Sequence, residues 1–191
     1  MKAAVGLGNP GLGYALSRHN VGFQVIDLYR ELERGVGTGR RAHHAIIYRH
    51  QDLLLAKPTT CMNGSGDAVR ALLAATGLHP RDVLLVHDEL DLPLGRLRIV
   101  PGGGPGTHKG VRSVIDAVGT TEIPRLKVGV EIEGRTVDGA SFVLERFPEE
   151  EWRRIAPVLR WAAAALAAFR RDPLAQVMTV FNRPPDGVAA G

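Results

Sequence analysis

Apolar and polar positions follow two different periods along this chain. Short apolar or alternating runs, bounded by turn residues, predict strands at residues 2–6, 45–48, 53–56, 83–86, 96–100 and 126–132. Apolar residues at helical spacing predict helices at residues 21–34, 67–76, 109–118 and 149–170, and a last short helix from 173 to about 182. Pro157 lies inside the longest of these helices and is expected to kink or split it.

The order of these elements predicts the fold class. Strands and helices intermingle, which is typical of an α/β domain, and the hairpin at 45–56 makes the sheet mixed rather than wholly parallel. With 191 residues, of which 45% are hydrophobic, the chain suits one domain with a sizeable core. We therefore expect a single α/β domain over residues 1–182, with helices flanking a mixed sheet, and a flexible C-terminal tail at 183–191.

Composition says more about the cellular compartment and the possible partners of the protein than about its chemistry. The formal net charge of +4 and the pI near 9.6 permit a polyanionic partner without requiring one. Most of the 24 basic residues are arginines, which codon bias explains more simply than selection for phosphate contacts. The single cysteine, Cys61, excludes an internal disulfide and fits a reducing compartment. Neither a signal peptide nor an apolar run of the roughly 20 residues that a bilayer needs is visible, so a cytoplasmic protein without a membrane segment is expected.

The first glycines of the chain match the dinucleotide fingerprint G-x-G-x-x-G. Residues 6–11 follow an apolar run, as that fingerprint requires. However, no helical period begins before Val21, and the acids near the required offset, Glu31 and Glu33, fall inside a predicted helix. Dinucleotide binding is therefore a minor alternative, and we expect these glycines to form a tight turn after the first strand.

Four polar clusters fall at or near the ends of predicted elements, where α/β sheets place their sites. They occupy residues 9–20, 57–66, 86–93 and 102–109. His19 is the only side chain of the first cluster that can act as a base near neutral pH, and Asp88 follows the buried strand. A histidine held by a buried aspartate is the basic unit of water activation. Taken alone, His19 is better explained as a surface or loop-capping histidine, and Asp88 could equally cap a turn.

Other chemistries fit the same clusters less well. Asp88 and Glu89 would point to opposite faces of a continuing strand, which disfavours a shared metal ion. The sequence around Ser65 lacks the spacing of a nucleophile elbow, and a lone cysteine such as Cys61 is more often a small buried hydrophobe. The glycine loop at 102–106 could present backbone N–H groups to an anion, or it could be a mobile surface loop. We expect neither metal nor cofactor.

Taken together, the clusters resemble bacterial peptidyl-tRNA hydrolases. The stretches that carry the resemblance are GLGNPGLGYALSRHNVG (6–22), KPTTCMNGSGDAV (57–69), HDELDLPLG (87–95) and GGGPGTHKGVRSV (102–114). Four ordered motifs are far more specific than any one of them. The resemblance implies a single domain with a twisted mixed sheet, generally monomeric. It also implies metal-independent hydrolysis of the ester between a peptide and the 3′ ribose oxygen of tRNA, which recycles tRNA from stalled translation.

The resemblance also implies roles for individual residues. His19 would be the general base, Asp88 the carboxylate that holds it, and Asn9 the reader of the first peptide bond. Binding of the substrate, the tRNA 3′ end and the acceptor stem would fall to Tyr14, Cys61, Met62, Asn63, His108, Lys109, Arg98 and Lys127. Within this set Asn63 would also position or stabilise the reacting carbonyl, and Arg98 and Lys127 would lie near the 5′ phosphate.

This chain departs from the family pattern at three of the binding positions. Lys109 stands where the pattern usually has asparagine, Cys61 where an aromatic residue is common, and Lys127 where arginine is usual. A non-catalytic RNA-binding relative on the same fold is therefore kept as an alternative, although His19 and Asp88 are both present. Residues 138–142 are a candidate lid over the cleft.

Overall fold

One seven-stranded sheet forms the centre of the molecule. The computed structural model describes residues 1–183, so the expected tail falls outside the described residues apart from Arg183. The strands are β1 (Lys2–Gly6), β2 (Arg40–Ala42), β3 (Ala45–His50), β4 (Leu53–Pro58), β5 (Val83–Pro93), β6 (Leu97–Val100) and β7 (Arg125–Glu131). They pair in the order β2-β3-β4-β1-β5-β7-β6. The inner pairs β4-β1-β5-β7 are parallel and the outer pairs antiparallel, which confirms the predicted mixed α/β sheet.

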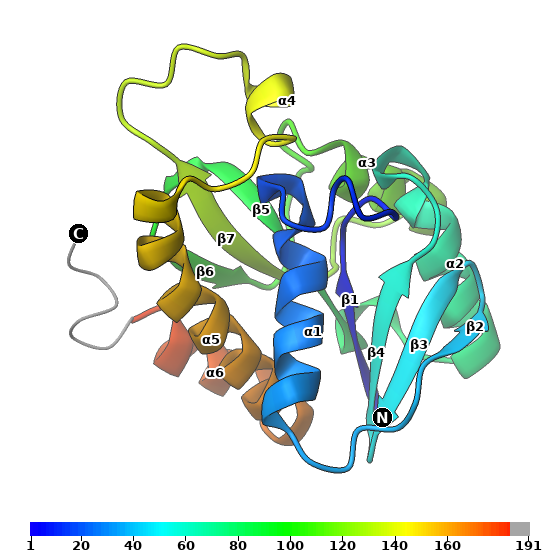
Figure 1. Ribbon diagram of the computed structural model, residues 1–191. Helices are drawn as coiled ribbons and strands as arrows, with labels where there is room; N and C mark the ends of the chain where they lie inside the picture. Colours follow the sequence, from blue (N-terminus) through cyan, green and yellow to red (C-terminus); the bar gives the residue numbers. More distant parts are fainter. Residues whose placement is uncertain (184–191) are drawn as a thin grey trace.

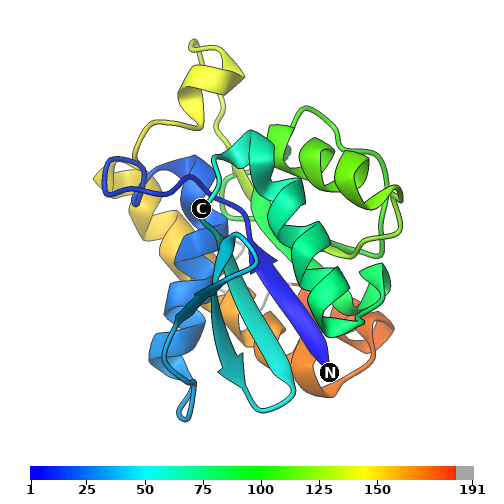
Figure 2. The ribbon, with the colours of Figure 1, turned by 90° about the vertical axis from the view of Figure 1, so that its right-hand side faces the viewer.

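Helices cover both faces of the sheet (Figures 1 and 2). They are α1 (Val21–Leu32), α2 (Ser65–Thr76), α3 (Lys109–Val118), α4 (Gly139–Phe142), α5 (Glu149–Arg171) and α6 (Leu174–Phe181). One apolar cluster joins α1, α5 and α6 to one face, and a second joins α2 and α3 to the other. The core is therefore divided by the sheet, with helices on either side, as in other parallel α/β folds.

Two predicted elements differ from those observed. The strand predicted at 83–86 continues to Pro93, because β7 runs beside it as far as Glu131. The apolar pattern stops at His87, but the strand does not end there. Its next residues are polar side chains that are buried in the fold. Pro157 does not split α5, which is helical from Glu149 to Arg171. The missing N–H removes one helical bond, and buried Ile155 and Val158 pack on either side of it.

The first glycines serve the contact between β1 and α1 as well as a turn. Gly6 is the last residue of β1, and a Cβ there would lie 2.3 Å from the carbonyl oxygen of Gly22. A Cβ on Gly22 would lie 2.4 Å from the carbonyl oxygens of both Leu7 and Val86. Side chains at these positions would force α1 away from β1 and β5. The expectation that Gly6 forms part of a turn is therefore wrong, whereas Gly11, with φ of +106°, does lie in one.

Candidate active site

A cleft of about 630 Å³ opens at the carboxyl ends of the parallel strands. These strand ends point towards the top of Figure 1. It is lined by most of the side chains that the sequence singled out: Asn9, His19, Cys61, Met62, Asn63, Asp88, His108 and Lys109. These come from all four polar clusters, which approach one another because the parallel strands end at the same edge of the sheet. The cleft is therefore the candidate active site.

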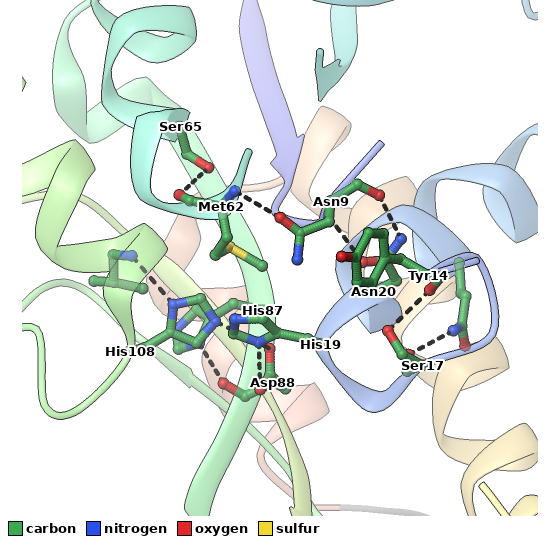
Figure 3. Close-up of polar contacts among 12 residues, drawn as sticks. Asn9, Tyr14, Ser17, His19, Asn20, Met62, Ser65, His87, Asp88 and His108 are labelled. Carbon is green, nitrogen blue, oxygen red and sulfur yellow. Dashed lines mark hydrogen bonds and ion pairs between the residues drawn. The ribbon is translucent and has the colours of Figure 1, made fainter. Parts of the chain in front are cut away.

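His19 and Asp88 form a hydrogen-bonded pair on its floor (Figure 3). His19 lies in a 3₁₀ turn just before α1, and its Nδ1 is 2.9 Å and 3.0 Å from the two carboxylate oxygens of Asp88. An ionised carboxylate only accepts hydrogen bonds, so Nδ1 must carry the proton and donate it. The other nitrogen, Nε2, is then left with its lone pair. Since His19 lines the cleft, this is the geometry of a base that can take a proton from water.

Asp88 receives a second hydrogen bond, from His108. The backbone N–H of Val111 donates to Nδ1 of His108 at 3.2 Å, which places the imidazole proton on Nε2. Nε2 then donates to Oδ1 of Asp88 at 3.0 Å. Burial alone would raise the pKa of Asp88, but the contacts with His108 and His19 outweigh it and hold the pKa well below its usual value. Asp88 is therefore ionised wherever the protein is folded near neutral pH.

The same three side chains could be suspected of holding a metal ion. Among the residues that the structure describes, His19, Asp88 and His108 offer ligand atoms within 4.8 Å of one another. A histidine ligand needs its lone pair on the metal and a proton on its other nitrogen, which usually donates to a carbonyl or carboxylate. In His108 that other nitrogen faces the N–H of Val111, which cannot accept a hydrogen bond. The tautomer therefore fits hydrogen bonding to Asp88 and does not fit metal binding.

We expect EDTA to leave the activity unchanged, because the tautomer of His108 does not fit a metal ligand and Nδ1 of His19 is bonded to Asp88. The assay would compare extensively dialysed protein with and without chelator, and with Zn²⁺ added back. A loss of activity in EDTA that Zn²⁺ restores would contradict this reading. Any magnesium that the substrate itself requires must be kept constant.

His87 packs against His108 and was not anticipated as part of the site. Its Nδ1 donates to the backbone carbonyl of Asp88 at 2.6 Å, and its ring meets that of His108 edge-on with centroids 4.7 Å apart. Burial lowers the pKa of His87 well below its usual value, and His108 adds to this. A neutral ring here supports His108 without adding charge next to Asp88.

Asn9 presents a defined half of its amide to the cleft. The backbone N–H of Met62 donates to Oδ1 of Asn9 at 2.8 Å, which fixes the amide orientation because an N–H can only donate. Its Nδ2 is therefore the group left to the cleft (Figure 3). Buried Asn20 holds the main chain of Asn9 from both sides, accepting from its N–H at 2.8 Å and donating to its carbonyl at 2.9 Å. The sequence had given no separate role to Asn20.

Comparison with known proteins decides the family. The model of the peptidyl-tRNA hydrolase family matches residues 3–187. The chain belongs to the peptidyl-tRNA hydrolase family. It is 42% identical over 182 residues to the peptidyl-tRNA hydrolase of Pseudothermotoga lettingae, covering 95% of this chain and 97% of that one. It is 43% identical over 183 residues to that of Moorella thermoacetica, covering 93% and 96%.

Solved structures of peptidyl-tRNA hydrolases share the fold. The crystal structure of the enzyme from Acinetobacter baumannii matches with a TM-score of 0.87 at 30% identity, over 95% of this chain and 94% of that one. The resemblance read from the four motifs is thereby confirmed. The dinucleotide alternative is not supported, since Gly11 is followed by turns and the next helix, α1, starts only at Val21. In the part of the chain that the structure describes, no helix is long and apolar enough to span a bilayer.

Some residues to which the resemblance gives a role in tRNA binding lie outside the cleft. Tyr14 lies in an exposed turn beside it, and Arg98 and Lys127 are cross-strand neighbours on β6 and β7. The Nζ of Lys127 is 2.6 Å from a carboxylate oxygen of Glu89, so its charge is already paired here. Buried Arg125 donates to the carbonyl of Gly104 at 2.7 Å and thereby holds the glycine loop.

The sequence analysis did not predict one wall of the cleft, apart from the candidate lid at residues 138–142. It consists of residues of β5 and β7 and of the segment around α4: Leu90, Glu131, Arg135, Ala140, Val143 and Leu144. Gly139 at the start of α4 lies so close to Leu90 that a Cβ there would be 2.8 Å from its Cδ1. Because these residues are apolar or paired surface charges, no motif marks them, and only their position identifies them. Movement of this wall as a lid stays a prediction.

Proposed function

We propose that this chain hydrolyses the ester between the peptide and the 3′ ribose oxygen of peptidyl-tRNA, with His19 as general base. The observation that carries the proposal is the lone pair of His19 Nε2, left free in the cleft by the bond from Nδ1 to Asp88. Nε2 takes a proton from water as the water oxygen attacks the acyl carbon. The bond between the acyl carbon and the ribose 3′ oxygen then breaks, and the imidazolium returns the proton to the leaving 3′ oxygen. Asp88 stabilises the imidazolium in between.

Two asparagines are proposed to bind the acyl part of the substrate. Asn9, with its Oδ1 occupied by Met62, offers Nδ2 as a donor to the carbonyl oxygen of the first peptide bond. An unblocked aminoacyl-tRNA has an ammonium group there instead, which cannot accept a hydrogen bond. Asn63 is exposed in the cleft and is proposed to position the reacting carbonyl and stabilise its developing negative charge.

The tRNA is proposed to approach from the side of Tyr14, Cys61 and Lys109, with its 3′ end in the cleft. Arg98 is proposed to contact phosphate of the acceptor stem, and Lys127 would exchange Glu89 for phosphate on binding. The cleft is complete within one chain, which supports a monomer that works without a protein partner. Its substrate arises in translation, which supports a cytoplasmic site of action.

Turnover of N-acetylaminoacyl-tRNA tests the proposal. Purified protein is expected to release free tRNA from this substrate over many cycles, and to release it far more slowly from the unblocked aminoacyl-tRNA. A protein that bound the substrate tightly without releasing tRNA would be the non-catalytic RNA-binding relative considered from the sequence.

Substitution of Asn9 should weaken the discrimination between the two substrates. Asn9→Ala removes the Nδ2 donor, worth about 1–3 kcal/mol when its partner is left unpaired, so kcat/KM for the N-acetylated substrate should fall roughly tenfold or more. Asn9→Asp keeps the acceptor for Met62 but presents a carboxylate to the cleft, so it should favour the ammonium of unblocked aminoacyl-tRNA further. The measurement is the ratio of kcat/KM for the two substrates. Unchanged ratios in both variants would remove Asn9 from this role.

A further inference from the structure

The peptide segment that carries His19 is attached to the missed wall of the cleft. The backbone N–H of His19 donates to the carbonyl of Val143 at 2.7 Å, and that of Arg18 donates to the carbonyl of Glu145 at 3.0 Å. Val143 and the following Leu144 line the cleft. The main chain of the base and one wall of its cleft are therefore parts of a single hydrogen-bonded unit.

The side chain of Arg18 is the centre of this unit. It is 2% exposed, and its Nη1 donates to the carbonyls of Phe142 at 3.3 Å and Arg146 at 3.1 Å. Its Nη2 donates to a carboxylate oxygen of Glu151 at 2.7 Å, in the first turn of α5. The guanidinium carbon lies 4.0 Å from the ring centroid of Phe142 and 5.2 Å from that of Phe147. One planar cation thus joins the end of α4, the following segment and the start of α5.

Stability alone does not account for a buried arginine at this place. A buried ion pair can often be replaced by apolar residues of similar volume with no loss of stability. What arginine adds is direction, because its rigid fork of donors fixes several acceptors at once, which a flexible lysine or an apolar chain cannot do. Here the acceptors belong to the segment to which the His19 backbone is attached.

We propose that Arg18 is the positioning residue of the general base. Arg18 does not line the cleft. It fixes residues 142–146 against the 3₁₀ turn that carries His19, so that the position of this wall and the orientation of the His19 side chain depend on each other. Asp88 holds the imidazole from the other side. This inference rests on the role proposed for His19, and a misplacement of the base by about 1 Å can cost on the order of a hundredfold in rate.

The test compares Arg18→Met and Arg18→Lys, each alone and combined with His19→Ala, using N-acetylaminoacyl-tRNA over a range of concentrations up to saturation. Arg18→Met is expected to lower kcat by roughly 10- to 100-fold with little change in KM, and Arg18→Lys to restore part of the loss. In the His19→Ala background the same change should lower kcat no further, because effects of residues that act as a unit are not additive. Arg153→Met, at an exposed arginine of α5, is the matched control and should keep full activity.

Proton NMR gives a second readout that a merely stabilising residue would not move. In Arg18→Met the low-field proton of His19 Nδ1 should shift or broaden, while that of His108 Nε2 stays in place as an internal reference. Folded Arg18→Met and Arg18→Lys proteins with wild-type kcat would overturn the inference, as would an undiminished effect of Arg18→Met in the His19→Ala background. If Arg18→Met does not fold, the same comparison is made with Arg18→Lys, alone and combined with His19→Ala. Failure of the proposed function would instead appear as full activity in His19→Ala alone.

Discussion

Replacing His19 with alanine is expected to lower kcat by about 10²- to 10⁴-fold while leaving affinity for tRNA nearly unchanged. In the pair with Asp88, the imidazole is proposed to take the proton from water. His19 lines the cleft, whereas Arg98 and Lys127, which are proposed to contact the tRNA, are not among the lining residues. Single-turnover rates with N-acetylaminoacyl-tRNA give the catalytic effect. Binding of uncharged tRNA, measured by fluorescence anisotropy, gives the affinity.

An exposed histidine supplies the control for this experiment. His79 lies at the start of the turn before β5, away from the cleft, and His79→Ala should retain wild-type kcat. Near-full activity in His19→Ala would remove His19 from the role of base, whereas a parallel loss of tRNA binding would make it a binding residue instead.

The second large effect is expected from Asp88→Asn, which keeps the shape of the side chain and removes its charge. The imidazolium of His19 would lose its counter-charge, and the amide nitrogen would face the N–H of His19 or His108 as a second donor. The tautomer with a free Nε2 is then no longer favoured. From the corresponding aspartate of serine proteases, a loss of about 10³- to 10⁴-fold in kcat is expected, with substrate binding largely retained. Activity within a few-fold of wild type would contradict the assignment.

The pH dependence of stability gives an independent check on Asp88. Its folded-state pKa is held well below the unfolded value of about 3.9, so the ionised form stabilises the native state at every pH above that value. This contribution is lost only as the pH falls through the folded-state pKa. Chemical unfolding should therefore show that wild type keeps its advantage in unfolding free energy over Asp88→Asn down to about pH 5 and loses it only in strong acid. Loss of this advantage above about pH 5 would contradict the lowered pKa of Asp88.

Local patterns predicted the elements well and one boundary poorly. The helices that start at Val21 and Lys109 begin where the period of apolar residues begins, because an amphipathic helix must keep one face towards the core. β5 was predicted too short because a run of polar residues normally ends a strand, whereas here His87 and Asp88 are buried by neighbours from elsewhere in the chain. Burial of polar residues depends on their partners, and partners are not visible in a local pattern.

The amino-acid sequence by itself determined the fold class, the family and the region of the site. Four polar clusters at the ends of elements sufficed, since parallel strands bring their carboxyl ends to one edge of the sheet whatever else the chain does. Only the tertiary structure decided which hydrogen-bonding groups face the cleft. Hydrogen-bond partners outside the local pattern determine the tautomers of His19 and His108 and the half of the Asn9 amide that faces the cleft. They also determine how Arg18 holds residues 142–146. Hydrogen bonds are directional and act over about 3 Å, so their pattern exists only once those segments have packed together.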